Sequence, residues 1–375
     1  MKDNLKRKDP INILEPIENI VCSYNEWDTL EEVIVGTVAG AAEIAYEPAL
    51  NGYPESRYFR GHKRSKEDID KGEAQLDNFA KILEDHGVIV KRPDKRDYFQ
   101  SYKTPDFEVP CGNVSACPRD VLLVVGNEII EAPMGFRGRF FEYLAYRSLV
   151  KEYFRKGAKW SAAPKPSMSD ELYVKGFSVD PIPFDAETNP SLTEFEPCFD
   201  AASFTRLGRD IIYQPDIVTN KFGAEWLARH LGPDYRFHQA RFKDMRPPQH
   251  IDATLVPLKP GLVLTNPERP CIDETIKLFK NNKWEVVDAV PSVNRVGCYS
   301  PEVSEWISMN VFSIDENMVI VEESEEPFIR QLESLGMKVI PCPFKDVYKF
   351  GGSFHCCTLD VRRKGVLQSY FPTLD

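Results

Sequence analysis

LEDHGVIVKRP, Leu83 to Pro93, joins the end of an amphipathic helix to a glycine stop and a short strand that closes at proline. Glycine accepts the left-handed backbone that ends helices, and proline cannot donate within a central strand. The order of residues therefore predicts helix, turn and strand. The same pattern recurs at FRKGAKWSAAP (Phe154 to Pro164), LARHLGPDYRFHQAR (Leu227 to Arg241), FKNNKWEVVDAVP (Phe279 to Pro291) and LESLGMKVIPCP (Leu332 to Pro343).

A β-rich stretch precedes each predicted helix. These stretches are EEVIVG at Glu31, RDVLLVVGNEIIEAP at Arg119, RDIIYQP at Arg209, GLVLTN at Gly261 and NMVIVEE at Asn317. A strand, strand, helix, strand (ββαβ) unit repeated five times predicts an α/β protein whose units are arranged radially, as in a five-bladed propeller with a helix outside each blade. A doubly wound open sheet is the alternative. No GxGxxG follows any strand, which excludes its usual nucleotide-binding form.

Length and composition limit the domain organisation. A chain of 375 residues is long enough for two or three ordinary domains, but one large closed architecture also fits. Residues 1–20 are polar and lack a periodic pattern, so we expect a flexible arm there and a single domain over 21–375. A second irregular stretch is expected from about Pro48 to Asp70.

The composition is that of a globular protein, with 42% hydrophobic and 28% charged residues. The longest apolar run, around Val121 to Val125, is too short to span a membrane, and MKDNLKRKDP at the N-terminus lacks the apolar stretch of a secretion signal. We therefore expect a cytoplasmic protein. Its nine cysteines show no disulfide framework or CxxC pair, so reduced thiols and no metal or cofactor are predicted.

The net charge of −11 would repel a polyanion. The sequence also lacks a basic stripe with interleaved aromatic residues, so nucleic acid is not expected as a partner. The same acidity suits a small cationic substrate. A solvated acidic surface that aids solubility is the more ordinary explanation.

The segment GGSFHCCTLD, Gly351 to Asp360, carries the clearest chemical signal. A cysteine in an intracellular enzyme with histidine and aspartate elsewhere in the chain is a candidate nucleophile, and glycines let backbone approach a bound group. A buried structural role is the alternative. If the segment is extended, Cys356 and Cys357 point to opposite faces, so only one of them lines a site.

Polar candidates fall just before the predicted hairpins. His250 opens HIDAT, and Asp252 would share its strand face. Asp120 precedes VLLVVG, and Asp200 lies some ten residues before RDIIYQ. Cys356 precedes TLDVRRKG, which in a closed ring would pair beside EEVIVG. Equivalent positions of a closed ring converge on its axis, so these side chains would meet, although an acidic residue before a strand is ordinary by itself.

Several carboxylates with a cysteine and a histidine fit a delocalised cation that is attacked by a thiolate. A guanidinium matches carboxylates through bidentate, charge-assisted hydrogen bonds. A bound guanidinium and a nearby imidazolium would also lower the pKa of the thiol.

Long segments of the chain resemble the L-arginine amidinotransferases, from about Cys22 to Tyr370. The matching segments are SYNEWDTLEEVIVG (Ser23 to Gly36), PRDVLLVVGNEIIEAPM (Pro118 to Met134), GAKWSAAPKP (Gly157 to Pro166), TEFEPCFDAASF (Thr193 to Phe204), HIDAT (His250 to Thr254) and GSFHCCTLDVRRKGVLQSY (Gly352 to Tyr370). The resemblance implies a five-bladed α/β propeller and ping-pong chemistry in which arginine gives its amidino group to an acceptor amine.

The resemblance also implies a role for each site residue. Cys356 corresponds to the nucleophile that forms an amidino-cysteine as ornithine leaves. His250 corresponds to the general acid and base, and Asp200 to the carboxylate that orients it. The residues that correspond to substrate ligands are Asp120 and Asp252 for the guanidinium, Arg269 for the substrate carboxylate, and Ser304 for a further contact.

The sequence departs from the family pattern near the expected acceptor site. Pro247 and Gln249 stand where glycine-using members carry asparagine and methionine, and Val303 replaces a serine beside Ser304. We therefore predict an acceptor longer than glycine, such as lysine, with glycine as the alternative. Cys357 falls where relatives vary, which favours Cys356 as the nucleophile.

Two other functions fit parts of the pattern. A deiminase on the same scaffold would let water resolve the cysteine adduct and release citrulline and ammonia. A guanidine-binding protein without catalysis would need the carboxylates but not the pair of Cys356 and His250. The expected partners are L-arginine and an acceptor amine, with a homodimer left open.

Overall fold

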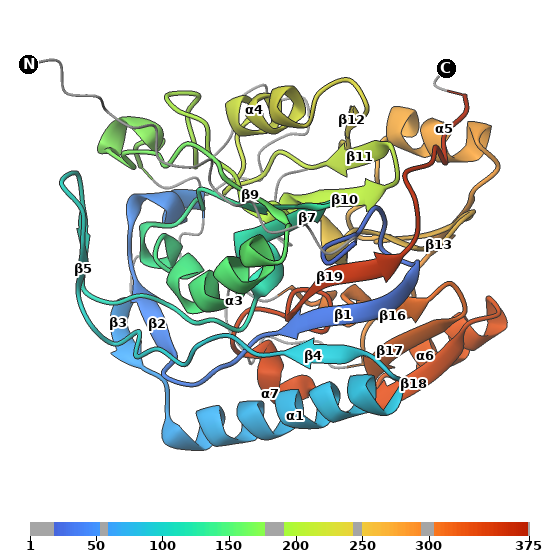
Figure 1. Ribbon diagram of the computed structural model, residues 1–375, viewed down its shortest axis with the longest axis horizontal. Coiled ribbons are helices and arrows are strands. Elements are labelled where there is room, and N and C mark those ends of the chain that lie inside the picture. Colours follow the sequence, from blue (N-terminus) through green and yellow to red (C-terminus); the bar gives the residue numbers. More distant parts are fainter. Residues whose placement is uncertain (1–18, 53–58, 177–190, 243–249, 294–303, 374–375) are drawn as a thin grey trace, which may run out of the picture.

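The computed structural model describes residues 19–52, 59–176, 191–242, 250–293 and 304–373 (Figure 1). These residues form five three-stranded sheets and two two-stranded sheets. Each three-stranded sheet has an antiparallel pair followed by a parallel strand, so the predicted α/β class and the five ββαβ units are confirmed. The closed propeller stays a prediction. The arm predicted over residues 1–20 lies outside the described residues except for its last two.

The five units have the following bounds. The first comprises β19 (Thr358–Lys364), β1 (Thr29–Val35), α1 (Lys66–Asp85) and β4 (Ile89–Lys91). The second comprises β7 (Leu122–Val125), β8 (Glu128–Glu131), α3 (Tyr143–Arg155) and β9 (Lys159–Ala162). The third comprises β10 (Phe204–Leu207), β11 (Asp210–Tyr213), α4 (Lys221–Leu231) and β12 (Arg236–Gln239). The fourth comprises β13 (Leu255–Lys259), β14 (Leu262–Thr265), α5 (Asp273–Asn281) and β15 (Glu285–Asp288). The fifth comprises β16 (Phe312–Asp315), β17 (Met318–Glu322), α6 (Glu326–Ser334) and β18 (Lys338–Cys342).

The second unit shows why the sequence folds this way. Gly126 has φ +59° and turns β7 back onto β8, with Val125 opposite Glu128. The next strand, β9, pairs with β8 in parallel, and a parallel neighbour requires a crossover, which α3 provides. The four residues of β7 are all buried, as expected for a strand covered on both faces.

The first sheet takes strands from both ends of the chain. β19 pairs antiparallel with β1, with Val33 opposite Asp360 and Ile34 opposite Leu359. This is the pairing that the sequence predicted between TLDVRRKG and EEVIVG. Contacts between units follow chain order: β19 touches β7, η5 (Ala201–Ser203) touches β7 and η6 (Ile251–Ala253), η6 touches η7 (Ile307–Met309), and β16 touches β1.

The remaining elements are short. They are β2 (Ala42–Ala45), η1 (Pro48–Gly52), β3 (Arg60–Lys63), β5 (Tyr102–Lys103), β6 (Glu108–Val109), α2 (Pro118–Val121), η3 (Arg137–Arg139), η4 (Asp170–Leu172) and α7 (Lys345–Tyr348). The expectation of an irregular stretch over 48–70 was wrong, because η1, β3 and the start of α1 lie there. Ser65 caps α1 by accepting the Asp68 backbone N–H at 3.0 Å, a start signal that the sequence contains.

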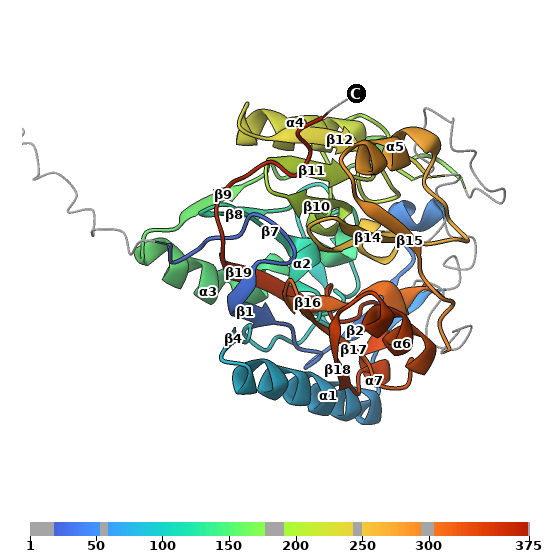
Figure 2. The same cartoon turned by 90° about the vertical axis from the view of Figure 1, so that its right-hand side faces the viewer.

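The helices lie outside the sheets. Figures 1 and 2 place α1 and α4 at opposite sides of the molecule, with the sheets between them. The buried face of α1 brings Phe79 edge-on to Phe354, with ring centroids 5.1 Å apart. Phe354 in turn stacks on Phe344 at 4.1 Å, so the chain just before Cys356 is anchored in the core. Among the described helices, none has the length and apolar character needed to cross a bilayer.

Candidate active site

The candidate nucleophile lies on the turn between α7 and β19. Gly351 has φ +92°, and a Cβ on Gly352 would lie 2.7 Å from Cys117 Sγ and 2.8 Å from Cys356 Cβ. Glycine is therefore required at 352 by close approach. The segment is a turn rather than extended, because the Cys357 N–H donates to the Ser353 carbonyl at 2.8 Å.

Only one of the two adjacent cysteines faces a cavity. Cys356 lines a pocket of about 680 Å³, whereas Cys357 is fully buried in the core around α1. The Cys356 N–H donates to Asn310 Oδ1 at 3.0 Å, which fixes the backbone at the nucleophile. The pocket is lined by Ile44, Asn113, Cys117, Asp120, Phe136, Arg139, His250, Asp252, Ala253, Ser304, Ile307, Asn310, Phe350, Gly351 and Cys356.

His250 lies between two carboxylates. Its Nε2 is 3.3 Å from Asp200 Oδ2, and its Nδ1 is 3.6 Å from Asp120 Oδ1. Burial opposes protonation of His250, but Asp120 and Asp200 outweigh burial and raise its pKa well above the ordinary value. The ring is therefore held as a proton donor in the free protein. His250 precedes the 3₁₀ helix η6, so the expectation that it shares a strand face with Asp252 was wrong.

Asp200 is placed behind the histidine rather than in the pocket wall. It is fully buried, and its Oδ1 accepts the Gly135 N–H at 2.8 Å. Arg139 Nη1 lies 3.5 Å from Asp200 Oδ2, and Arg139 Nη2 lies 2.9 Å from Asp120 Oδ2. Arg139 therefore ties together the two carboxylates that flank His250.

Asp120 and Asp252 face the same pocket from different units. Among the described residues, Asp120 Oδ1 is buried without a hydrogen-bond partner. Burial raises the pKa of Asp120, against the pull of His250 and Arg139. Asp252 Oδ2 lies 2.8 Å from His355 Nδ1 and 3.3 Å from Cys356 Sγ. Burial opposes ionisation of Asp252, but His355, together with His250 and Asn310, outweighs burial and lowers the pKa of Asp252.

The thiol of Cys356 is protonated in the free protein. Its contact with the Cys117 thiol, its burial and the charge of Asp252 raise its pKa well above the ordinary value, and His250 acts in the opposite direction. A cation bound beside Asp120 and Asp252 would offset their negative charge and favour the thiolate. A cation bound in this pocket would therefore convert the Cys356 thiol to its more reactive form.

The other predicted residues are less close to the thiol. Ser304 lines the pocket, and its Oγ accepts the Trp306 N–H at 3.0 Å. Arg269 lies outside the lining, where its Nη1 donates to Gln214 Oε1 and Thr254 Oγ1, both at 3.1 Å. Pro247, Gln249 and Val303 fall outside the described residues.

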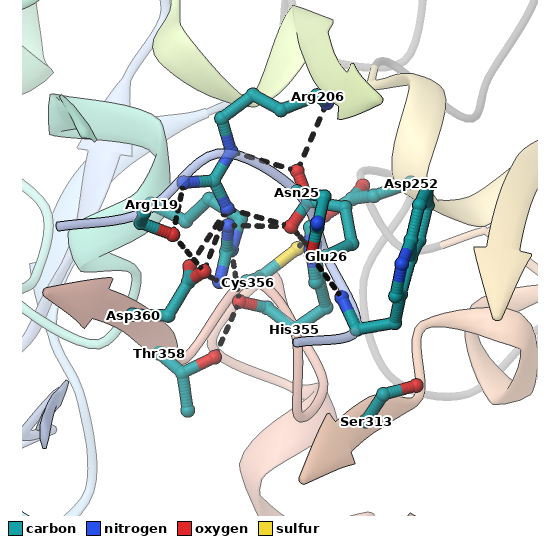
Figure 3. Close-up of polar contacts among 12 residues, drawn as sticks. Asn25, Glu26, Arg119, Arg206, Asp252, Ser313, His355, Cys356, Thr358 and Asp360 are labelled. Atoms are coloured by element: carbon teal, nitrogen blue, oxygen red, sulfur yellow. Dashed lines mark hydrogen bonds and ion pairs between the residues drawn. The ribbon is translucent and has the colours of Figure 1, made fainter. Parts of the chain in front are cut away.

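The sequence analysis missed several residues that support the site. Arg139 forms a bidentate pair with Glu142 at 3.0 and 2.9 Å, and Asn310 holds the Cys356 backbone. The three-residue spacing of Arg139 and Glu142 was a usable signal. Burial raises the pKa of Glu142 to about 7 despite the pull of Arg139. Figure 3 shows a second missed group, in which His355 links Asp252 to Glu26.

Solved structures and curated relatives share this architecture. An amidinotransferase of the saxitoxin biosynthetic pathway from Microseira wollei is 47% identical, covers 94% of this chain and 99% of that one, and superposes with a TM-score of 0.84. Inosamine-phosphate amidinotransferase from Streptomyces griseus is 37% identical at the same coverage and TM-score. Dimethylarginine dimethylaminohydrolase, 15% identical with a TM-score of 0.56, shows a likeness of fold alone. No family model matches the chain.

Two curated relatives agree with the structural comparison. The L-arginine:L-lysine amidinotransferase of Pseudomonas savastanoi pv. phaseolicola is 48% identical over 93% of this chain and 96% of its own length. The mitochondrial glycine amidinotransferase of Gallus gallus is 47% identical over 95% of this chain and 86% of its own. A cysteine and histidine beside paired carboxylates, on this scaffold, define an enzyme acting on guanidino groups. The chain belongs to the L-arginine amidinotransferase family.

Proposed function

We propose that the enzyme transfers the amidino group of L-arginine through an amidino-cysteine on Cys356 to an amine longer than glycine. The observation that carries the proposal is the buried Asp120 Oδ1, which lacks a hydrogen-bond partner among the described residues and faces the pocket that Cys356 lines. A buried carboxylate oxygen without a hydrogen bond costs free energy unless a ligand supplies one, even with the His250 ring 3.6 Å away. The planar guanidinium of arginine offers the N–H donors that it requires.

The first half-reaction uses the proton of His250. The Cys356 thiolate attacks the guanidinium carbon, the bond from that carbon to the ornithine nitrogen breaks, and His250 gives its proton to the departing nitrogen. An aliphatic amine leaves poorly without that proton, and general acid catalysis typically contributes about 10² to 10⁴ in rate. Asp120 and Asp200 support this role because both raise the pKa of His250.

The second half-reaction reverses these roles. The acceptor amine attacks the amidino carbon, the carbon–sulfur bond breaks, and His250 accepts a proton from the acceptor nitrogen. The thiolate and the imidazolium are restored. The proton that the Cys356 thiol gives up to solvent when arginine binds returns to it once the guanidino product has left, so the protons balance over the cycle. Ornithine must leave before the acceptor enters the same pocket, which is the ping-pong order that the sequence predicted.

We also propose that the five units close into a five-bladed propeller. The contacts from β19 to β7 and through η5, η6 and η7, together with the contact between β16 and β1, support a closed ring. In such a ring the segments just before the hairpins meet at the axis. This arrangement would account for the meeting of Asp120, Asp200, His250 and Cys356 from separate units.

A panel of acceptor amines tests the proposed acceptor. We expect kcat/KM with lysine or another long amine to exceed that with glycine at equal arginine. The reason lies in the sequence: the glutamine at position 249 could form hydrogen bonds with a polar substrate, and the proline at position 247 would restrict φ there. Ornithine release and the guanidino product are measured together. The relatives do not identify the acceptor amine, because a glycine amidinotransferase and an L-arginine:L-lysine amidinotransferase are nearly equally similar to this chain.

Three results would contradict this proposal. A clear preference for glycine would overturn the acceptor, and Gln249→Met with an unchanged ratio would show that this residue does not select it. Citrulline and ammonia in place of ornithine and a new guanidino compound would make the enzyme a deiminase.

A further inference from the structure

His355 lies directly before the nucleophile but does not line its pocket. Its Nδ1 is 2.8 Å from Asp252 Oδ2, and its Nε2 is 3.2 Å from Glu26 Oε2. The imidazole is thus the link between one pocket carboxylate and one buried carboxylate behind it (Figure 3). Both ring nitrogens therefore face carboxylate oxygens, one on each side of the ring.

Glu26 is itself fixed by a buried ion network. Arg206 holds it in a bidentate pair, with Nε–Oε1 at 2.9 Å and Nη2–Oε2 at 2.8 Å, and Arg119 Nη1 lies 3.3 Å from Oε2. Arg206 and Arg119 also contact Asp360 at 2.7 Å each. Burial opposes ionisation of Glu26, but Arg206, His355 and Arg119 outweigh it and hold the pKa of Glu26 far below the ordinary value.

The network spans several parts of the fold. Glu26 precedes β1, Arg119 lies in α2, Arg206 in β10 and Asp360 in β19. All four side chains are at most about one-twentieth exposed. A fixed anion at this point can anchor the far side of the His355 ring and so determine where its Nδ1 points.

The two pocket carboxylates differ in their partners. Both are buried, yet the pKa of Asp120 is raised by burial, whereas that of Asp252 is lowered because His355, with His250 and Asn310, outweighs burial. Asp252 also lies 3.3 Å from the Cys356 thiol, so its charge and orientation bear directly on the reacting atoms. Protonated Asp252 would lose the charge that attracts a guanidinium.

We propose that His355 is a positioning residue that keeps Asp252 ionised and oriented toward the arginine guanidinium, with Glu26 as its anchor. This inference rests on the proposed function, because it assigns the guanidinium to Asp252. His355 acts through Asp252 and does not exchange a proton with the substrate. His355 and Glu26 thus hold Asp252 in its binding orientation before arginine binds.

The test is His355→Gln, compared with the parent for arginine-dependent ornithine release. We expect KM for arginine to rise about tenfold to a hundredfold, the range seen when outer partners of metal-binding side chains are removed. The value of kcat at saturating arginine should fall less. Loss of the His355 contact raises the pKa of Asp252, so kcat/KM should recover as the pH rises, and its acidic limb should move to higher pH.

The titratable groups that surround these two residues define what such a pH profile reports. Those facing Asp252 are His355, Cys356, His250 and Asp120, and those facing His355 are Asp252 and Glu26. Arg119 is bonded to the His355 carbonyl at 2.8 Å, and of the two pocket carboxylates it is Asp252 that His355 contacts directly. Thiol and His250 titrations should change little in His355→Gln. A shift confined to the acidic limb therefore points to Asp252.

His238→Gln is the matched control. His238 Nε2 lies 2.8 Å from the buried Asp210, so the substitution removes the same kind of contact outside the pocket. We expect it to leave KM and the pH profile unchanged. Thermal unfolding of both variants separates loss of stability from loss of substrate binding.

A binding cycle keeps the inference testable if turnover is too slow. In the Cys356→Ala background, arginine affinity is measured for His355→Gln, Asp252→Asn and both together. If His355 acts through Asp252, the second substitution adds little to the first. Additive losses, or His355→Gln behaving like His238→Gln, would overturn the inference. A parent enzyme that releases no ornithine from arginine would instead refute the proposed function.

Discussion

We expect Cys356→Ala to abolish amidino transfer and Cys357→Ala to keep most of it. The two thiols are adjacent, but only Cys356 lines the pocket with Asp120, Asp252 and His250. Without the sulfur no covalent intermediate can form, and loss of a nucleophile costs on the order of 10⁶ in kcat in well-studied hydrolases. Ornithine release from arginine with an acceptor present measures both variants.

Intact-mass analysis tests the intermediate directly. Parent enzyme mixed with arginine alone should gain one amidino group, and peptide mapping should place it on Cys356. Cys357→Ala should show the same adduct, and Cys356→Ala should show none. An adduct on Cys357, or full activity without Cys356, would refute the assignment.

The repeat was predictable because each unit contains its own local signals. Gly336 at φ +78° and the strand Lys338–Cys342 follow the helix Glu326–Ser334, as the phrase LESLGMKVIPCP indicates. The pairing of β1 with β19 was predictable too, since a closed ring would bring the C-terminal strand beside the first one. The stretch 48–70 was misjudged because its β3 strand, RGHK, has no apolar alternation to detect.

From the sequence, only those residues of the candidate site that lie in recognisable motifs could be predicted. Cys356, His250 and the three aspartates stand at the ends of strands or in short polar segments that sequence reading can isolate. Glu26, Arg206 and Asp360 are distant in sequence, and their meeting depends on the packing of the first unit against the third. Nothing in the local pattern distinguishes their charges from solvent-exposed ones.

His250→Asn lowers turnover by about 10² to 10⁴, because the departing ornithine nitrogen loses its proton donor. Asp200→Asn lowers it less, since that carboxylate orients and charges the imidazole without reaching the substrate. The order of the two effects follows from their places: His250 lines the pocket, and Asp200 lies behind it. Asp210→Asn, which disturbs the His238 pair outside the pocket, should leave turnover unchanged.

The pH dependence of Asp200→Asn separates orientation from general damage. In the parent, Asp120 and Asp200 raise the pKa of His250 well above its ordinary value, so the donor form persists at alkaline pH. Removing one carboxylate lowers that pKa, so the protonated fraction at a given alkaline pH falls. The alkaline limb of single-turnover ornithine release should therefore move to lower pH in Asp200→Asn and stay in place in Asp210→Asn. An unshifted limb would mean that His250 does not supply the proton, because its charge would then have no bearing on departure of the amine.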